Sequence, residues 1–238
     1  MKPIPLSQRI IFALDVESGD LAKEWVTRLE SEITLFKVGL ELFLAAGFDI
    51  VHWIRDRGLE VMLDLKFFDV PQTVARAVRQ VNRSNVALVT VHGNDAMLQA
   101  AVEAAERTRV LAVTALTSLD QSDLNDLGFA CRPEELVLSR ARRALELGCA
   151  GVVSSGLEAQ SLRQDLGSRL LIVTPGVRPV TNRSLDDQKR TVSPQEAFAC
   201  GADHVVVGRP LRQASDPLAL VRSMQQDITQ GLATAGTP

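Results

Sequence analysis

The chain has 238 residues, of which 46% are hydrophobic and 23% charged, so it has enough apolar material for a substantial core and is not extensively disordered. Its formal net charge of -3 gives no general attraction to nucleic acid or to an anionic membrane, and we expect neither as a partner. Any anionic ligand must therefore be held by a local site.

The N-terminal segment places Pro3, Pro5 and Arg9 ahead of a short apolar run that stops at Asp15, which is not the pattern of a secretory signal. No apolar run reaches the roughly 20 residues that a membrane span needs. The 3 cysteines form no CxxC pair and have no metal-ligand spacing to the histidines. We therefore expect a cytoplasmic protein that holds no metal.

Short β-branched apolar runs alternate with segments of helical periodicity along the whole chain. The predicted strands are 10–16, 35–39, 60–66, 86–93, 110–116, 150–156, 169–176 and 203–210. Between two of these strands, Pro71 to Val81 predicts a helix: Val70, Val74 and Val78 share one apolar stripe, and Pro71 suits a first helical turn.

Continuously apolar strands that each precede a helix indicate a parallel sheet covered on both faces. Eight such units of about 30 residues each predict an α/β protein, a (β/α)8 TIM barrel. We expect residues 1–238 to form a single domain with a frayed tail after about residue 230. The alternative is an open doubly wound sheet, but such sheets more often have fewer strands and a glycine-rich first turn, and the first predicted strand ends without that motif.

Polar side chains gather at the carboxyl-terminal ends of the predicted strands. In a barrel these ends share one face, and that face carries the active site. The residues at these ends are Asp15, Lys37, Asp64, Lys66, His92, Thr117, Ser118, Ser154, Ser155, Arg178 and Arg209. Residues that are far apart in the sequence are therefore predicted to converge.

The most informative cluster is Asp64, Lys66 and Asp69, within an otherwise apolar stretch. Strand alternation places Asp64 and Lys66 on the same side of the third predicted strand. Charges at the edge of a core must be paired, yet this cluster has two carboxylates for one ammonium, an imbalance that a functional site would explain. The alternatives are an ion pair that seals the barrel end and, for Asp69 alone, a cap on the following helix.

The last predicted strand leads into Gly208 and Arg209, where the backbone can approach a ligand and a helix begins. Barrels of this kind often bind phosphate after the seventh and eighth strands, although Arg209 could also be a surface arginine. The polar loop that opens at Thr174 and continues through Gln188 is interpreted as a closing lid. His92 fits a core histidine as well as a site residue.

The residues that carry a family resemblance are Asp15, Lys37, Asp64, Lys66, Asp69, Thr73, Thr117, Ser118, Arg178, Gln188, Gly208 and Arg209. With them, the chain resembles the bacterial orotidine 5'-phosphate decarboxylase family over essentially its whole length. The DxKxxDxxxT element at 64–73 is shared by a superfamily, but its occurrence together with Lys37, Gln188 and Arg209 is specific.

The resemblance implies decarboxylation of orotidine 5'-monophosphate to UMP in de novo pyrimidine biosynthesis, without a metal or an organic cofactor. Lys66 would donate a proton to C6 of the pyrimidine, Asp64 would lie against the substrate carboxylate, and Lys37 would link the ribose to the charged network. The family also implies a homodimer in which Asp69 and Thr73 reach the partner's active site. This replaces the cap-only interpretation of Asp69.

The resemblance assigns the remaining residues to parts of the nucleotide. The ribose would be held by Asp15, the pyrimidine amide by Thr117 and Ser118, and the phosphate by Gln188, Gly208 and Arg209 with help from Arg178.

Two other functions fit the same motif. One is a Mg²⁺-dependent relative such as 3-keto-L-gulonate 6-phosphate decarboxylase or hexulose-phosphate synthase, but these place a glutamate where this chain has Lys37, whose charge would repel the metal. The other is a barrel that only binds a nucleotide, which has no need for a lysine held between aspartates.

Overall fold

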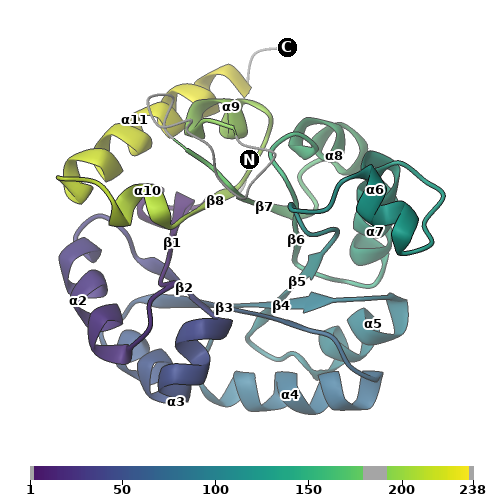
Figure 1. Ribbon diagram of the computed structural model, residues 1–238, viewed down its shortest axis with the longest axis horizontal. Helices are drawn as coiled ribbons and strands as arrows, with labels where there is room; N and C mark the ends of the chain where they lie inside the picture. The colour runs from purple at the N-terminus through teal and green to yellow at the C-terminus, as the bar shows by residue number, and fades with distance from the viewer. Residues whose placement is uncertain (1–2, 179–191, 236–238) are drawn as a thin grey trace.

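The computed structural model describes residues 3–178 and 192–235, which form a closed parallel barrel surrounded by helices (Figure 1). The strands pair in chain order, and β8 closes the ring by pairing with β1. They are β1 (Ile10–Ala13), β2 (Leu35–Gly39), β3 (Glu60–Phe67), β4 (Leu88–His92), β5 (Arg109–Val113), β6 (Gly151–Val153), β7 (Leu171–Pro175) and β8 (His204–Val207). The predicted (β/α)8 barrel and its eight strands are confirmed.

The helices lie outside the ring of strands in the order of the sequence (Figure 1). They are α1 (Leu6–Arg9), α2 (Gly19–Leu29), α3 (Leu40–Asp56), α4 (Pro71–Arg83), α5 (Asp95–Ala104), α6 (Gln121–Asp126), α7 (Pro133–Glu146), α8 (Ala159–Leu166), α9 (Pro194–Ala199), α10 (Arg209–Arg212) and α11 (Pro217–Ala235). None of the described helices is long and apolar enough to cross a bilayer.

Two apolar layers hold the barrel together. Inside the ring, alternate strand residues such as Ile11, Met62 and Leu111 pack against one another and fill the lumen. Between strands and helices, residues such as Phe12 and Phe36 are fully buried in a larger core. The barrel is thus solid below its carboxyl-terminal mouth, and only the ends of the strands are left to build a site.

The first turn of α4 differs in one respect from the expected apolar stripe. Val74 and Val78 are buried as predicted, but Val70 is 62% exposed. Val70 precedes the helix in an extended conformation, with φ -56° and ψ 146°, so the helical periodicity does not apply to it. Its side chain adds to an apolar surface beside the site.

The C-terminal segment was predicted to fray after about residue 230, but α11 continues to Ala235. Gly231 explains the difference, because it lies so close to α9 that an added Cβ would be 2.4 Å from the carbonyl oxygen of Gln195 and 3.0 Å from the Cβ of Phe198. This tight packing keeps the last turns of the helix on the barrel.

Candidate active site

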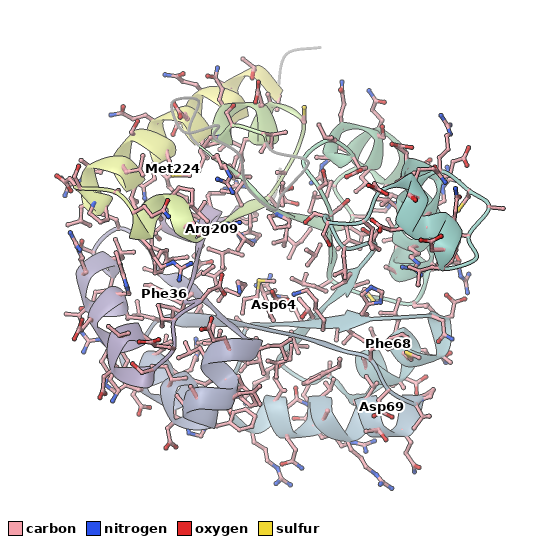
Figure 2. All side chains as sticks on the ribbon, in the orientation of Figure 1. Phe36, Asp64, Phe68, Asp69, Arg209 and Met224 are labelled. Carbon is pink, nitrogen blue, oxygen red and sulfur yellow. The ribbon has the colours of Figure 1, made fainter. Side chains whose placement is uncertain are left out.

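A cavity of about 260 Å³ opens at the carboxyl-terminal end of the barrel, where polar side chains from opposite sides of the ring meet. Its polar lining comprises Asp15, Lys37, Asp64, Lys66, Thr117, Arg178, Gly208 and Arg209. All of them were predicted from the strand ends or from the family resemblance. Figure 2 shows Asp64 beside the centre of the ring, with Arg209 across from it on the α10 side.

The charges on one side of the cavity form an alternating chain. The Lys37 Nζ lies 2.7 Å from Asp15 Oδ1 and 3.7 Å from Asp64 Oδ2, and the Lys66 Nζ lies 3.0 Å from both carboxylate oxygens of Asp64. Lys37 is 8% exposed and Asp64 9% exposed, so these charges depend on one another for compensation. Lys37 supplies the positive charge that the local sequence cluster lacked.

Strand pairing and a small residue put Lys37 in place. Lys37 pairs with Ala13 of β1 on one side and Met62 of β3 on the other, which carries its side chain to the mouth of the barrel. A Cβ at Gly39 would lie 2.9 Å from Lys37 Nζ and 3.3 Å from Asp15 Oδ1. Only glycine leaves room for this ion pair, a role that the sequence alone did not reveal.

Lys66 has an unusual backbone. Its φ is +49°, in the left-handed region that residues other than glycine rarely adopt, and the register between β3 and β4 shifts between Leu63 and Phe67. This bulge replaces the simple strand alternation expected for Asp64 and Lys66, although both side chains still point into the same site. The Lys66 amide donates a 3.0 Å hydrogen bond to the hydroxyl of Thr90 in β4.

Sequence reasoning also missed Thr90. Its hydroxyl donates a 2.9 Å hydrogen bond to Asp64 Oδ1, and the residue is fully buried. The available signal was a polar residue in the middle of an otherwise apolar strand, but which groups it would contact depends on how β3 and β4 pair.

The opposite side of the cavity is built from the ends of β7 and β8. Gly208 packs so closely that an added Cβ would lie 3.2 Å from the Cβ of Ala13. Arg209 then begins the short helix α10, and Arg212 of the same helix donates a hydrogen bond to the backbone carbonyl of Asp15. Arg178, only 7% exposed, completes this cationic side of the cavity. The arrangement suits a compact anion.

The predicted lid falls largely outside the described residues, and so does Gln188. The described residues at its two ends lie together: Val177 and Val192 form a parallel bridge, and the Arg178 amide donates a 3.0 Å hydrogen bond to the Val192 carbonyl. Of the described residues on either side of this gap, Val177 and Arg178 line the cavity.

Three described residues that the family resemblance assigns to the site do not line the cavity of this chain, and neither do Ser154 and Ser155, which are buried at the end of β6. Asp69 is exposed and lies toward the rim of the barrel, away from Asp64 (Figure 2), while Thr73 is exposed on the first turn of α4. Ser118 is exposed in the loop after β5. Asp69 is not the cap of the following helix, because the N-cap of α4 is Val70 and Asp69 Oδ1 accepts a 2.6 Å hydrogen bond from the Val70 amide.

His92 lies beside the site and not in it. Its ring contacts the exposed Phe68 edge to face, with 5.6 Å between centroids. The pKa of His92 is lowered, mainly by burial and further by the positive charges of Arg140 and Lys66. The neutral imidazole forms one wall of an apolar hollow of about 400 Å³, which Phe68, Leu116 and Leu127 also line.

The fold and this site define a class of protein: a (β/α)8-barrel enzyme with lysine–aspartate ion pairs on one side of its mouth and two arginines on the other. Comparison with known proteins narrows the class. Residues 8–224 match the model of the Orotidine 5'-phosphate decarboxylase / HUMPS family, and the chain belongs to this family.

Individual relatives are similar to this chain over nearly the full length of both sequences. The chain is 53% identical over 228 residues to orotidine 5'-phosphate decarboxylase from Methylococcus capsulatus, covering 95% of this chain and 94% of the relative. It is 44% identical to the protein of that name from Stenotrophomonas maltophilia, covering 97% and 98% of the two chains. A crystal structure of orotidine 5'-phosphate decarboxylase from Lactobacillus acidophilus superposes with a TM-score of 0.82 at 31% identity, covering 93% and 99%.

Proposed function

We propose that this chain decarboxylates orotidine 5'-monophosphate to UMP and CO₂ in pyrimidine biosynthesis, with Lys66 as the proton donor. The names of the relatives support the reaction, and the family makes the chain a decarboxylase, a carboxy-lyase. One observation carries the mechanism: the Lys66 ammonium is held 3.0 Å from both oxygens of Asp64 inside the cavity.

The reaction requires a cation beside the reacting carbon. When the bond between C6 and the carboxylate breaks, CO₂ leaves as a neutral molecule and the electron pair stays on C6, with no adjacent carbonyl to delocalise it. A lysine ammonium at C6 stabilises that charge and then supplies the proton that completes UMP. We assign this step to Lys66, whose side chain is 34% exposed and so faces the space that a substrate would occupy.

Asp64 makes a smaller direct contribution. A substrate carboxylate about 4 Å from this carboxylate would be repelled by roughly 4 kcal/mol at an effective dielectric constant of 20, and the repulsion would vanish as neutral CO₂ leaves. Enzymes lower barriers by about 8–23 kcal/mol, so repulsion cannot account for the catalysis. We infer that Asp64 mainly holds Lys66 in position.

The remaining cavity residues are proposed to bind the nucleotide. Arg209 and Arg178 would hold the phosphate beside Gly208, with Gln188 as a further ligand. Asp15 and Lys37, paired at 2.7 Å, would hold the ribose. Thr117 and Ser118 would contact the pyrimidine amide. Because the phosphate is remote from C6, its binding energy can orient the ring without taking part in the chemistry.

The charges favour a reaction without a metal. The Lys37 ammonium lies between the carboxylates of Asp15 and Asp64, so a positive charge already occupies the position where carboxylates would hold Mg²⁺. This argues against the Mg²⁺-dependent members of the same superfamily. We propose that no cofactor of any kind is needed.

We propose a homodimer whose two active sites are shared, with Asp69 and Thr73 serving the partner's site. The surface around Asp69 supports self-association: its neighbours Phe68 and Val70 are 67% and 62% exposed, and Phe68 lines the apolar hollow together with Leu116. Exposed apolar side chains that lie together suit a surface that a second copy of the chain would cover. The charged nucleotide substrate is consistent with the predicted cytoplasmic location.

The test is a spectrophotometric assay of orotidine 5'-monophosphate with the purified protein in excess EDTA. We expect full turnover in EDTA and no gain on adding Mg²⁺. Turnover that is lost in EDTA and restored by Mg²⁺ would favour the metal-dependent relatives, and the absence of turnover in both conditions would reject the assignment.

A further inference from the structure

We propose that Thr90 is a positioning residue for catalysis, because its single hydroxyl fixes both the backbone of the proton donor Lys66 and the carboxylate of Asp64. The inference rests on the proposed role of Lys66 and adds to it a residue from the neighbouring strand. Thr90 does not line the cavity, so it would act through these two residues.

The backbone of Lys66 has a conformation that is rare for a residue other than glycine. Among the described residues, only Lys66 and Asn85 have positive φ angles without being glycine. Such a conformation persists only where the surroundings enforce it. At the bulge, the Lys66 amide points to Thr90 Oγ1 at 3.0 Å, so this hydroxyl satisfies the amide in the left-handed conformation.

The Thr90 hydroxyl accepts one hydrogen bond and donates another. Thr90 accepts from the Lys66 amide, and its one proton is then donated to Asp64 Oδ1 at 2.9 Å. Asp64 in turn accepts from the Lys66 Nζ at 3.0 Å. The contacts close a ring that runs from the Lys66 backbone through Thr90 and Asp64 to the Lys66 ammonium.

The ring of hydrogen bonds is important because the contacts that hold the Lys66 ammonium in place are those with Asp64. The Lys66 side chain is 34% exposed, whereas Thr90 is fully buried, so water cannot replace the hydroxyl if it is removed. The rate of proton transfer falls steeply as the distance between donor and acceptor grows. A small displacement of a catalytic group therefore reduces turnover strongly. The hydroxyl therefore sets where the proton is delivered.

The test compares Thr90→Val, which keeps the shape and removes the hydroxyl, with Thr90→Ser, which keeps the hydroxyl. We expect kcat to fall about 10- to 100-fold in Thr90→Val, with KM for orotidine 5'-monophosphate changed by less than about threefold. Thr90→Ser should retain kcat within about threefold of the wild type.

Thr114→Val is the matched control. Thr114 is also fully buried in the barrel, but its hydroxyl donates to the backbone carbonyl of Val153 at 3.0 Å and not to the Asp64 or Lys66 side chain. Its loss should lower stability and leave kcat unchanged. An unchanged kcat in Thr90→Val, or an equal loss of kcat in Thr90→Ser or Thr114→Val, would overturn the inference.

Two further measurements separate this inference from the proposed function. Turnover by the wild type tests the function without reference to Thr90. Hydrogen exchange of the Lys66 amide in the wild type tests the geometry even if Thr90→Val does not fold. Slow exchange supports the hydrogen bond to the buried hydroxyl, and exchange as fast as that of an exposed loop amide would reject it.

Discussion

The Lys66 ammonium lies 3.0 Å from each carboxylate oxygen of Asp64, so the aspartate holds it symmetrically. The two residues are separated by one position in β3, and a bulge directs both side chains to the mouth of the barrel. This geometry suits the proton donor that we propose: the carboxylate fixes the cation, and the cation carries the proton that would be donated.

We predict that Lys66→Ala abolishes decarboxylation and leaves UMP binding largely intact, because the ammonium acts at C6 and the phosphate is held across the cavity. The measurement is kcat by absorbance together with the Kd of UMP by calorimetry. Lys23→Ala is a suitable control, since Lys23 is on the surface and pairs with Asp20 of the same helix. Turnover of Lys66→Ala within tenfold of the wild type would exclude Lys66 as the proton donor.

Arg209→Ala is predicted to weaken the binding of UMP far more than the binding of uridine, because only UMP has the phosphate dianion that the guanidinium would bind. Loss of a charged hydrogen bond of this kind costs about 1.5–3 kcal/mol, or roughly 10- to 150-fold in Kd. The surface variant Arg222→Ala, which loses an ion pair with Glu32, should bind UMP normally. An equal loss for UMP and uridine would remove Arg209 from the phosphate site.

Gly39→Ala is predicted to reduce activity more than stability. Its added methyl group would meet the flexible end of Lys37, which can move at little cost to the fold, but that movement separates the ammonium from Asp15. We expect kcat/KM to fall at least about tenfold, while Tm changes by only a few degrees. Gly128→Ala offers a comparison in which no atom lies within 4 Å of the added methyl, but its φ of +84° strains an alanine, so this variant should lose stability and keep its kcat/KM. Normal kinetics in Gly39→Ala would show that the Lys37 position is not critical.

The sequence predicted the barrel and the polar mouth because both follow from local patterns. Strands that are buried on both faces appear in the sequence as continuous apolar runs. Polar residues at the carboxyl-terminal ends of such strands then lie on one face of the barrel. Asp64, Lys37 and Arg209 meet in the cavity for this reason, although they come from three separate strands or their ends.

What the sequence did not predict depends on contacts between strands. The left-handed backbone of Lys66 and its bond to Thr90 arise from the register between β3 and β4, which no single segment encodes. The need for glycine at position 39 depends in the same way on where the Lys37 side chain ends. Asp69 faces away from the cavity of its own chain, and its predicted role requires a second chain, which a single sequence does not describe.

Stability should depend on pH through His204, which is 2% exposed at the start of β8. Burial lowers its pKa to about 4, and the nearby Arg9 and Arg109 act in the same direction, whereas the Gln8 carbonyl and Asp203 oppose it. Because the pKa is lower in the folded state than the 6.5 expected after unfolding, protons bind preferentially to the unfolded chain. The contribution of His204 to stability is therefore complete above about pH 6.5 and is lost as the pH falls toward 4.

This pKa difference corresponds to a loss of at most roughly 3 kcal/mol in the free energy of unfolding between pH 6.5 and 4. Urea denaturation across this range measures it. In His204→Gln the free energy of unfolding should fall less steeply as the pH is lowered. His52→Gln, which replaces an exposed histidine, should show the same pH dependence as the wild type. The same slope in His204→Gln would assign the acid sensitivity to other groups.

The shared active site can be tested by mixing two inactive variants. Lys66→Ala and Asp69→Asn should each be inactive as homodimers, because every site lacks either the proton donor or the partner's carboxylate. In a mixed dimer one site carries both defects, and the other combines the intact Lys66 of one chain with the intact Asp69 of its partner. Random reassociation of equal amounts makes half of the dimers mixed, so activity should recover to roughly a quarter of the wild type. If Asp69 served its own chain, every site in the mixture would keep one defect and no activity would return.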